Sequence, residues 1–265
     1  MQEIGLLVRK SLVHRITLQN GNQFNEDLRY GDMNEMPWYR QPEDDVFPTT
    51  AAILAELFRR DPRGLVLDRA TADKLVLTCR FVAILTASIL KAKGIPCRVR
   101  SGFEPYCTPE GQMTCDHWIC QYWDKKQDRW ITIDPDCSLE CLNFDSYDMP
   151  SDVFHFAGPS WKAARSGKQD PHYFCNACGY SGYGPLVWEL FYDFHSLMNH
   201  EIIYMHSPKF LNNRFTQKSH NLSDSEMEQL DELAEYLSEP DQYFDQLHNM
   251  WETKREFRLL GGALL

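Results

Sequence analysis

Cys79, His117 and Asp134 are residues whose types and order are typical of nucleophilic catalysis. The pattern of residues 79–90 predicts a helix that begins at the cysteine and is apolar nearly all round, so we expect this helix to be buried. The free amides and macrodipole at a helix N-terminus favour a thiolate there. A thiolate nucleophile needs an imidazole that protonates the leaving group and an acceptor that orients the ring. Cys79 is the candidate nucleophile, His117 the candidate base and acid, and Asp134 the candidate orienting carboxylate.

A predicted β-hairpin brings the histidine and the aspartate to one end of a ribbon. The runs Trp118–Trp123 and Trp130–Ile133 are aromatic and β-branched, and a polar turn joins them. Counted from a turn centre near Lys126, His117 and Asp134 lie at almost equal distances along the chain. We therefore expect the two side chains to be near cross-strand neighbours.

The stretches that surround these residues carry a family resemblance. Cys79–Ala83 opens the helix, Gly94-Ile95-Pro96-Cys97-Arg98 follows it, and His117-Trp118 and Asp134-Pro135 come next in order. This order resembles the core of the transglutaminase-like superfamily, and the likeness covers about residues 68–136. It implies a papain-like core in which a Cys-His-Asp triad is formed by Cys79, His117 and Asp134.

Other segments extend this resemblance or depart from it. Residues 156–168 resemble a bacterial branch of transglutaminase-like proteins. Cys97 replaces the small residue that usually follows Ile-Pro, and residues 75–78 lack the family's Gly-x-Cys character. The second donor of an oxyanion hole is therefore not identified by the sequence.

The predicted elements define an α+β protein with a papain-like, transglutaminase-like core and a helical C-terminal extension. We expect a single domain over residues 1–265, with the catalytic core at about 45–145 and the extension at about 146–265. The predicted strands are 11–18, 97–103, 118–123 and 130–133, residues 22–48 are expected to be irregular, and the predicted helices are 51–60, 68–93 in two pieces, 151–164, 186–206, 223–237 and 240–259.

Each catalytic assignment has a plainer alternative. Cys79 could be a buried structural thiol, since free cysteine is often buried. His117 could be an ordinary strand residue, and Asp134 could only start the turn before Pro135. Asp136 is placed equally well for the carboxylate role; we favour Asp134 because it ends the apolar alternation of its strand.

Several residues outside the triad are candidates for binding. We expect Trp38, Tyr39, Trp118 and Trp161 to line a substrate cleft. Cys175 and Cys178 have the spacing of zinc ligands, but a structural zinc needs four ligands and the sequence contains no second such pair. We therefore predict neither a metal nor another cofactor.

The amino-acid composition of the chain limits the classes of partner that we expect the protein to bind. The chain has 265 residues, 27 Lys and Arg against 38 Asp and Glu, and a formal charge of −11. No basic cluster fits a nucleic-acid partner, and no apolar stretch is long enough to span a membrane. The nine cysteines and the lack of a secretory leader pattern predict free thiols in a cytoplasmic protein.

These expectations combine into a thiol acyl-transfer enzyme. Cys79 would attack the carbonyl of a peptide or small-molecule amide or thioester, and water or an amine would resolve the acyl-enzyme. Hydrolase, peptidase and amide-forming acyltransferase share this intermediate, while a calcium-dependent cross-linker is disfavoured because the sequence has no calcium-loop pattern. The alternative is a catalytically inactive transglutaminase-like fold that binds a peptide or a metabolite.

Overall fold

The protein is a mixed α+β structure whose chain forms two compact units. The computed structural model describes residues 1–16, 21–27, 29–107, 113–137, 142–202, 204, 208–211 and 222–258. Unit 1 consists of residues 1–99, 118–151 and 201–203, and unit 2 consists of residues 100–117, 152–200 and 204–265. The strands β3 (Cys97–Glu104) and β4 (Thr114–Asp124) contribute residues to both units.

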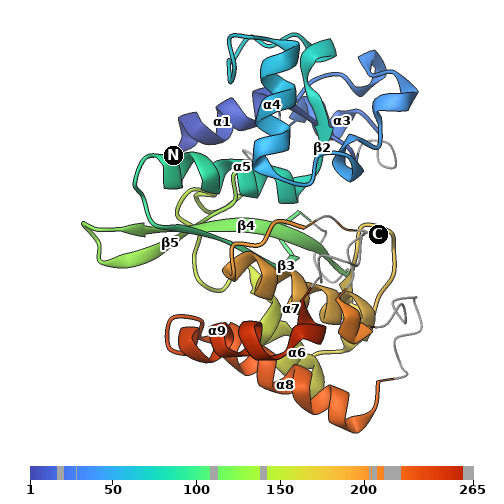
Figure 1. The fold of residues 1–265 in the computed structure, drawn as a ribbon. Coiled ribbons are helices and arrows are strands. Elements are labelled where there is room, and N and C mark those ends of the chain that lie inside the picture. The colour runs from blue at the N-terminus through green and yellow to red at the C-terminus, as the bar shows by residue number, and fades with distance from the viewer. Residues whose placement is uncertain are drawn as a thin grey trace. The chain divides into compact units, whose positions relative to one another are not determined.

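Unit 1 contains a short parallel strand pair and a buried helix. The strands β1 and β2 pair in parallel, and the helices α1 and α4 pack on α5 (Figure 1). The elements of this unit besides β3 and β4 are α1 (Gln2–Lys10), β1 (Leu12–His14), α3 (Gln23–Asp27), η1 (Met33–Glu35), η2 (Trp38–Arg40), η3 (Glu43–Asp45), α4 (Thr50–Arg60), η4 (Thr71–Asp73), β2 (Leu75–Leu77), α5 (Cys79–Ala92) and β5 (Arg129–Ile133).

The helix α5 is the central apolar element of unit 1. Its backbone begins at the N-cap Thr78, whose carbonyl accepts hydrogen bonds from the amides of Phe81 and Val82. It ends at Lys93, after which Gly94 adopts a φ of +73°, the left-handed conformation that glycine tolerates best. Most of its side chains are buried, so its position is set by packing along its whole length.

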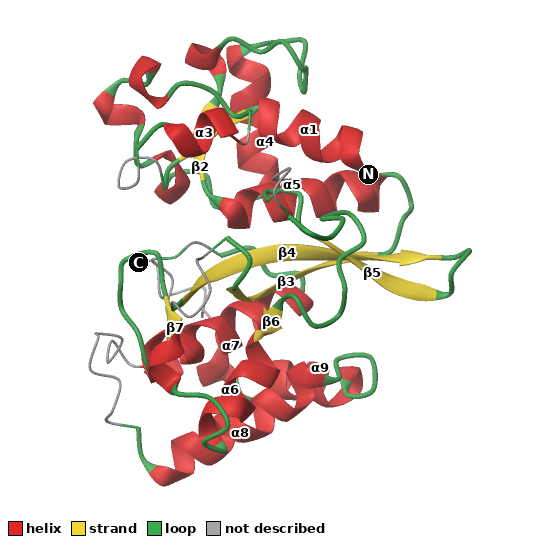
Figure 2. Ribbon diagram, turned by 180° about the vertical axis from the view of Figure 1, so that it is seen from behind, coloured by secondary structure: helices red, strands yellow, loops and turns green. Residues whose placement is uncertain are grey.

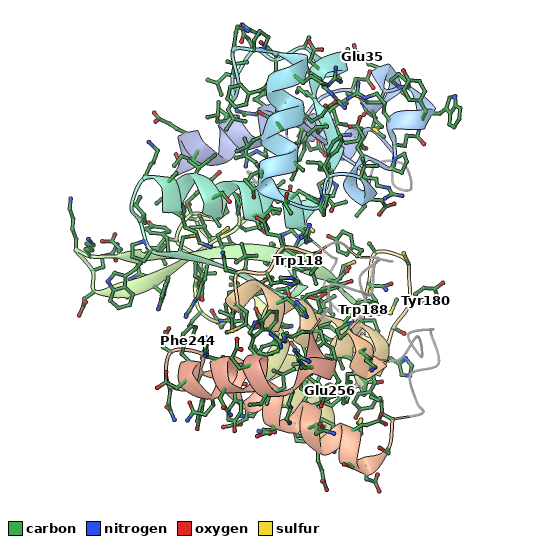
Figure 3. The ribbon with its side chains drawn as sticks, viewed as in Figure 1. Glu35, Trp118, Tyr180, Trp188, Phe244 and Glu256 are labelled. Carbon is green, nitrogen blue, oxygen red and sulfur yellow. The ribbon has the colours of Figure 1, made fainter. Side chains whose placement is uncertain are left out.

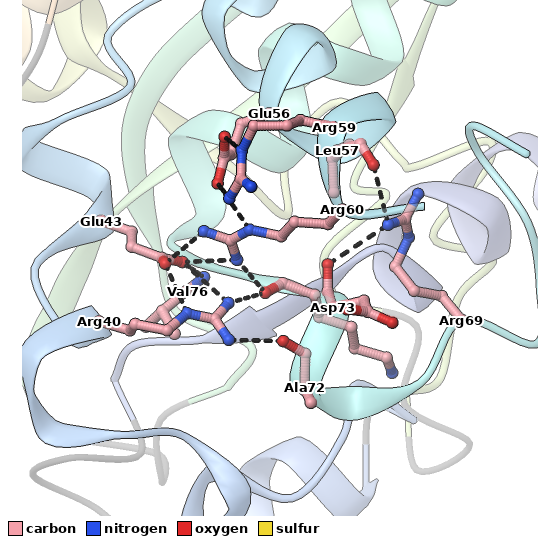
Figure 4. Close-up of polar contacts among 11 residues, drawn as sticks. Arg40, Glu43, Glu56, Leu57, Arg59, Arg60, Arg69, Ala72, Asp73 and Val76 are labelled. Atoms are coloured by element: carbon pink, nitrogen blue, oxygen red, sulfur yellow. Dashed lines mark hydrogen bonds and ion pairs between the residues drawn. The ribbon is translucent and has the colours of Figure 1, made fainter. Parts of the chain in front are cut away.

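A network of charged side chains fixes the segment before β2 against α4 (Figure 4). The carboxylate of Glu43 is buried and accepts hydrogen bonds from Arg40 Nε at 2.7 Å and from Arg60 Nη2 at 2.6 Å. The same carboxylate accepts the amide of Val76 at 2.8 Å. Arg40 and Arg60 both also donate to the carbonyl of Lys74. Glu43 thus anchors β2, the strand that directly precedes the start of α5.

The β4–β5 hairpin is antiparallel. Its register pairs Trp123 with Trp130 and Cys120 with Ile133, and Asp128 in the turn has a φ of +53°. The two tryptophan rings meet edge to face at 5.5 Å, and the guanidinium of Arg98 lies 4.0 Å from the ring centroid of Trp130. Cross-strand aromatic pairs of this kind stabilise a hairpin and define its register.

Unit 2 is mainly a helical layer on short strands (Figure 2). The strand β3 pairs antiparallel with β6, and β4 pairs in parallel with β7. The helix α6 packs on α7 and α8, and α8 packs on α9. The elements of this unit besides β3 and β4 are β6 (His155–Phe156), α6 (Ala157–Arg165), η5 (Pro171–Tyr173), β7 (Phe174–Cys175), α7 (Tyr183–Leu197), η6 (Lys209–Leu211), α8 (Asp224–Ser238), α9 (Phe244–Thr253) and η8 (Arg255–Phe257).

A buried ion pair holds the polar part of the unit 2 core. The Arg100 guanidinium donates two hydrogen bonds of 2.8 Å to the carboxylate of Asp193, which has no exposed surface. Asp193 also accepts the amide of Ser101 at 3.0 Å. Because the buried carboxylate has three donors, its charge is compensated inside the core.

Several predicted elements are confirmed. The helix expected at 51–60 is α4, with the side chain of Thr49 accepting from the amide of Ala52. The helix that starts at Cys79 and the strands around Cys97, Trp118 and Trp130 are present. The helix expected at 223–237 is α8, where Ser223 and Glu226 form a capping box.

Other predictions were wrong at the level of local structure. Residues 75–77 form β2 where a helical piece was expected, because this apolar tripeptide is buried by pairing with β1. The helix expected from residue 151 begins only at Ala157, after β6 has paired with β3. In the N-terminal region, α1 was not predicted, and α3 and three short 3₁₀ turns lie in the segment expected to be irregular.

The boundaries of the remaining helices also differ from expectation. The helices predicted at 186–206 and 240–259 are α7 and α9, both of which end earlier. Residues 17 and 18 of the predicted first strand and residues 203, 205, 206 and 259 of these two predicted helices lie outside the described residues. The predicted catalytic core of 45–145 is divided between the two units, and its organisation as one domain stays a prediction.

Within the described part of the chain, no helix combines the length and the hydropathy that crossing a bilayer requires.

Candidate active site

Cys79 is the first residue of α5, as the sequence predicts. The residue is half-buried. The backbone amides of the first turn of a helix have no partners within the helix and point toward groups at its start. This position favours a negative charge on the sulfur.

His14 is brought to Cys79 by the parallel pairing of β1 and β2. His14 lies opposite Leu77 in the register, and the amide of Arg15 donates to the carbonyl of Leu77 at 2.9 Å. Because α5 starts two residues after Leu77, the end of β1 reaches the start of the helix. A ring nitrogen of His14, the sulfur of Cys79 and a carboxylate oxygen of Asp136 all lie within 4.8 Å of one another.

The orientation of the His14 ring is defined on both sides. When the ring is neutral, Nδ1 accepts the amide of Ile16 at 3.2 Å and the proton is on Nε2, whereas the protonated ring carries a proton on both nitrogens. Nε2 lies 3.4 Å from Oδ2 of Asp136. The backbone amide of His14 donates to Oδ1 of Asn25 at 2.8 Å, which fixes the strand beneath the ring.

The buried cluster favours the protonated form of His14. Burial is the largest single influence and lowers the pKa of His14, but the carboxylate of Asp136 and the thiol of Cys79 both raise it. The net pKa is about 9, above the ordinary value of 6.5. A charged imidazole beside a cysteine is the arrangement of a thiolate–imidazolium pair.

The loop after β5 presents Asp136 to the histidine. Oδ1 of Asp134 accepts the amides of Asp136 and Cys137, both at 3.0 Å, and the amide of Asp134 donates to the carbonyl of Ser146 at 2.8 Å. Arg9 donates to the carbonyl of Pro135. These contacts hold the backbone of residues 134–137 in one turn, so Asp134 organises the loop that carries Asp136.

Tyr30 completes the surroundings of the Asp136 carboxylate. Its hydroxyl donates to Oδ1 of Asp136, and its ring centroid lies 5.7 Å from that of His14. The backbone carbonyl of Tyr30 accepts from the ammonium of Lys74, a buried group whose pKa is lowered to about 8 by burial. The two carboxylate oxygens of Asp136 thus face Tyr30 and His14 separately.

The three residues of the predicted triad are divided between the two units. Cys79 and Asp134 belong to unit 1, whereas His117, on β4, belongs to unit 2. Asp134 lies one residue beyond the end of β5 and is fully buried; His117 is also buried and its ring lies 6.5 Å from that of Phe154. The pairing of His117 with Cys79 and Asp134 stays a prediction.

The four aromatic residues expected to bind substrate differ widely in exposure. Trp38 and Tyr39 on η2 are 80% and 64% exposed, and their rings meet edge to face at 6.0 Å. Trp118 is buried, with the guanidinium of Arg80 lying 5.7 Å from its ring centroid. Trp161 is buried in unit 2 and donates its indole N–H to Asp231 at 2.6 Å. Their role in binding stays a prediction.

A metal ion would find three suitable donors in unit 1. The thiol of Cys79, the imidazole of His14 and the carboxylate of Asp136 are the sulfur, nitrogen and oxygen ligands that Zn²⁺ accepts. Among the described residues, Cys175 and Cys178 belong to no such group of three. The zinc-like spacing of these two cysteines therefore corresponds to no metal cluster in the part of the chain that the structure describes.

Sequence reasoning missed His14 and Tyr30 and ranked Asp136 second. His14 ends a short apolar strand with no motif around it, and only the pairing of β1 with β2 across the connection from Arg15 to Lys74 brings it to Cys79. A histidine at the end of an apolar run gives no signal that separates this role from an ordinary strand position.

Comparisons with family models, with curated proteins and with solved structures found no match for this chain.

Proposed function

We propose that the protein is a thiol acyl-transfer enzyme in which Cys79 is the nucleophile. The observation that carries the proposal is the grouping of Cys79, at the start of α5, with the His14 imidazole and the Asp136 carboxylate within 4.8 Å. Helix start, cationic imidazole and partial exposure are three independent features that favour a reactive thiolate. The transglutaminase-like order of motifs around Cys79 supports the same role.

In the proposed reaction, the Cys79 thiolate attacks the carbonyl carbon of an amide or a thioester. The tetrahedral intermediate collapses as an imidazolium protonates the leaving amine or thiol, and an acyl-enzyme remains. Water or an amine then attacks the acyl-enzyme and restores the thiolate. The proposed enzyme is therefore a hydrolase or peptidase when water attacks the acyl-enzyme, and an amide-forming acyltransferase when an amine does.

Two histidines are candidates for the proton transfer. A ring nitrogen of His14 lies within 4.8 Å of the Cys79 sulfur, and the raised pKa of His14, about 9, suits a resting ion pair with the thiolate. His117 is the candidate from the order of sequence motifs, with Asp134 as its carboxylate. With His14 as the proton donor, Asp136 is the partner of its imidazole, and the Asp134 carboxylate accepts a backbone amide of the loop.

The proposal is tested by site-resolved alkylation of the full chain. Iodoacetamide is applied between pH 5 and 9, and the modification of each cysteine is followed by peptide mass spectrometry. We expect Cys79 to react at mildly acidic pH, at least about tenfold faster than the other eight cysteines, because only a thiolate reacts. The variants His14→Gln and His117→Gln separate the two candidates, since loss of the true ion-pair partner moves the pH midpoint of Cys79 labelling upward.

A second measurement addresses acyl transfer itself. The acetyl thioester of N-acetylcysteamine serves as a minimal acyl donor, and intact mass spectrometry detects an acetyl group on the chain. We expect acetylation that is lost in Cys79→Ala. Alkylation of Cys79 no faster than that of the other thiols, together with no acyl adduct, would favour the alternative of an inactive fold that binds a peptide or a metabolite.

A further inference from the structure

Unit 2 contains a second thiol site, formed by Cys115 on β4 and Cys175 on β7. The two strands are parallel neighbours, and their register places Cys115 directly opposite Cys175. The two thiols are close enough to shift each other's pKa, and neither is in a disulfide. Directly paired strand residues have Cα separations compatible with a disulfide, so the backbone needs no large movement to bring the sulfurs together.

The residues around the pair hold it in this register. The thiol of Cys115 lies 3.4 Å from Oδ1 of Asp116, and the same oxygen accepts the amide of Ala177 at 2.8 Å. Asp116 thereby ties β4 to the segment that follows Cys175. The Asp116 side chain, one residue after Cys115, thus contacts the backbone two residues after Cys175.

Cys178 lies on a short hairpin that begins at Cys175. Cys175 forms an antiparallel bridge with Ser181, and Asn176 accepts the amides of Cys178 and Tyr180 through its side chain. Cys178 is exposed on this hairpin, as is Tyr180, which Figure 3 labels, whereas Cys175 is buried at its base. The backbone thus directs Cys175 toward β4 and leaves Cys178 on the surface.

The two thiols are electrostatically unequal. Hydrogen bonding to Cys175, and then burial, raise the pKa of Cys115. The hydrogen bond from Cys115 lowers the pKa of Cys175. The two thiols therefore differ in acidity, with Cys175 the more readily ionised, which is the relation between the two thiols of a redox-active pair.

We propose that Cys115 and Cys175 form a reversible disulfide when the protein meets a hydroperoxide. The proposal is independent of the acyl-transfer function, because it uses no residue of the Cys79 cluster. It also accounts for two of the cysteines that acyl transfer leaves without a role. Oxidation would replace a hydrogen-bonded contact between β4 and β7 with a covalent bond.

The chemistry balances with a hydroperoxide as the oxidant. The Cys175 thiolate attacks one oxygen of hydrogen peroxide, the O–O bond breaks, and a sulfenic acid and one hydroxide form, the hydroxide leaving as water after protonation. The Cys115 sulfur then attacks the sulfenic sulfur; the S–S bond forms, the S–O bond breaks, and the second oxygen leaves as water. The two thiols lose two electrons and two protons, and the peroxide is reduced to two molecules of water.

The experiment maps disulfides in the full-length protein after treatment with hydrogen peroxide. Free thiols are blocked with iodoacetamide, and the chain is cut after aromatic residues without reduction. Cys115 then lies in the peptide 107–118 and Cys175 in the peptide 175–180. We expect a cross-link between these two peptides that disappears on treatment with dithiothreitol.

Three variants identify the sulfurs, because each peptide carries a second cysteine. The cross-link is expected to persist in Cys107→Ser and in Cys178→Ser, and to be absent in Cys175→Ser, whose fold is checked by circular dichroism. A cross-link that requires Cys107 or Cys178 overturns the proposal. So does full alkylation of both Cys115 and Cys175 at a peroxide concentration that oxidises the exposed Cys178.

Discussion

Nε2 of His14 lies 3.4 Å from Oδ2 of Asp136, and both side chains are almost fully buried. A histidine and a carboxylate at this distance form an ion pair when the ring is protonated, and the cost of burying them is offset only if both remain partnered. Tyr30 supplies the second partner of the carboxylate, and the turn organised by Asp134 fixes its backbone. The pair is therefore held by hydrogen bonds within unit 1, and its atoms lie within 4.8 Å of the sulfur of the candidate nucleophile.

Asp136→Asn is expected to lower the pKa of His14 by more than about one unit, because burial then acts without its main opposing charge. The measurement is a histidine titration by nuclear magnetic resonance on the full chain. Asp148→Asn is the matched control, since Asp148 pairs with Arg129 at the surface and lies outside this cluster. An unchanged His14 pKa in Asp136→Asn would contradict the assigned ion pair.

The stability of the protein is expected to fall as the pH rises from about 6.5 to about 9. A histidine whose folded pKa is raised contributes stability that is complete below its unfolded pKa of 6.5 and is lost as the pH passes through about 9. The expected contribution is of the order of 3 kcal/mol. Urea unfolding at several pH values measures it, and His14→Gln should flatten the dependence over that interval. Equal slopes for both proteins would argue against the raised pKa.

Glu43→Gln is expected to destabilise unit 1 by about 3 kcal/mol, because it leaves two arginines around a buried site without their carboxylate. The free energy of unfolding in urea is the measurement. Glu235→Gln serves as the control, because Glu235 pairs with Lys162 at the surface, where such pairs contribute less than about 1 kcal/mol. Similar losses for the two variants would show that the Glu43 network does not hold β2.

Zn²⁺ is expected to protect Cys79 from iodoacetamide, because Cys79, His14 and Asp136 offer three converging donors. Protection should be reversed by a chelator, should be weakened at least about tenfold in His14→Gln, as for loss of one ligand contact, and should not occur with Mg²⁺, which prefers oxygen ligands. Site-resolved alkylation gives the readout. Equal protection in His14→Gln would show that the metal binds elsewhere.

The sequence by itself determined the features that depend on neighbouring residues. The apolar run of α5 and the hairpin of Trp123 and Trp130 follow from local periodicity and turn chemistry, and the structure has both. Thr78 stands at the N-cap position of α5, but its side chain makes no capping hydrogen bond. The position of Cys79 at a helix start was predictable for the same reason. Local patterns also identified both aspartates near the end of β5 as candidates.

Only the tertiary structure decided which groups surround Cys79 within unit 1. His14 reaches it because β1 pairs in parallel with β2, and Asp136 faces His14 because Asp134 uses its carboxylate to hold the turn. Pairing between strands far apart in sequence depends on burial of both strands together, and a short apolar tripeptide such as Leu75–Leu77 carries no local sign of its partner. The candidate nucleophile could therefore be predicted from the sequence, whereas its charged neighbours could be identified only from the fold.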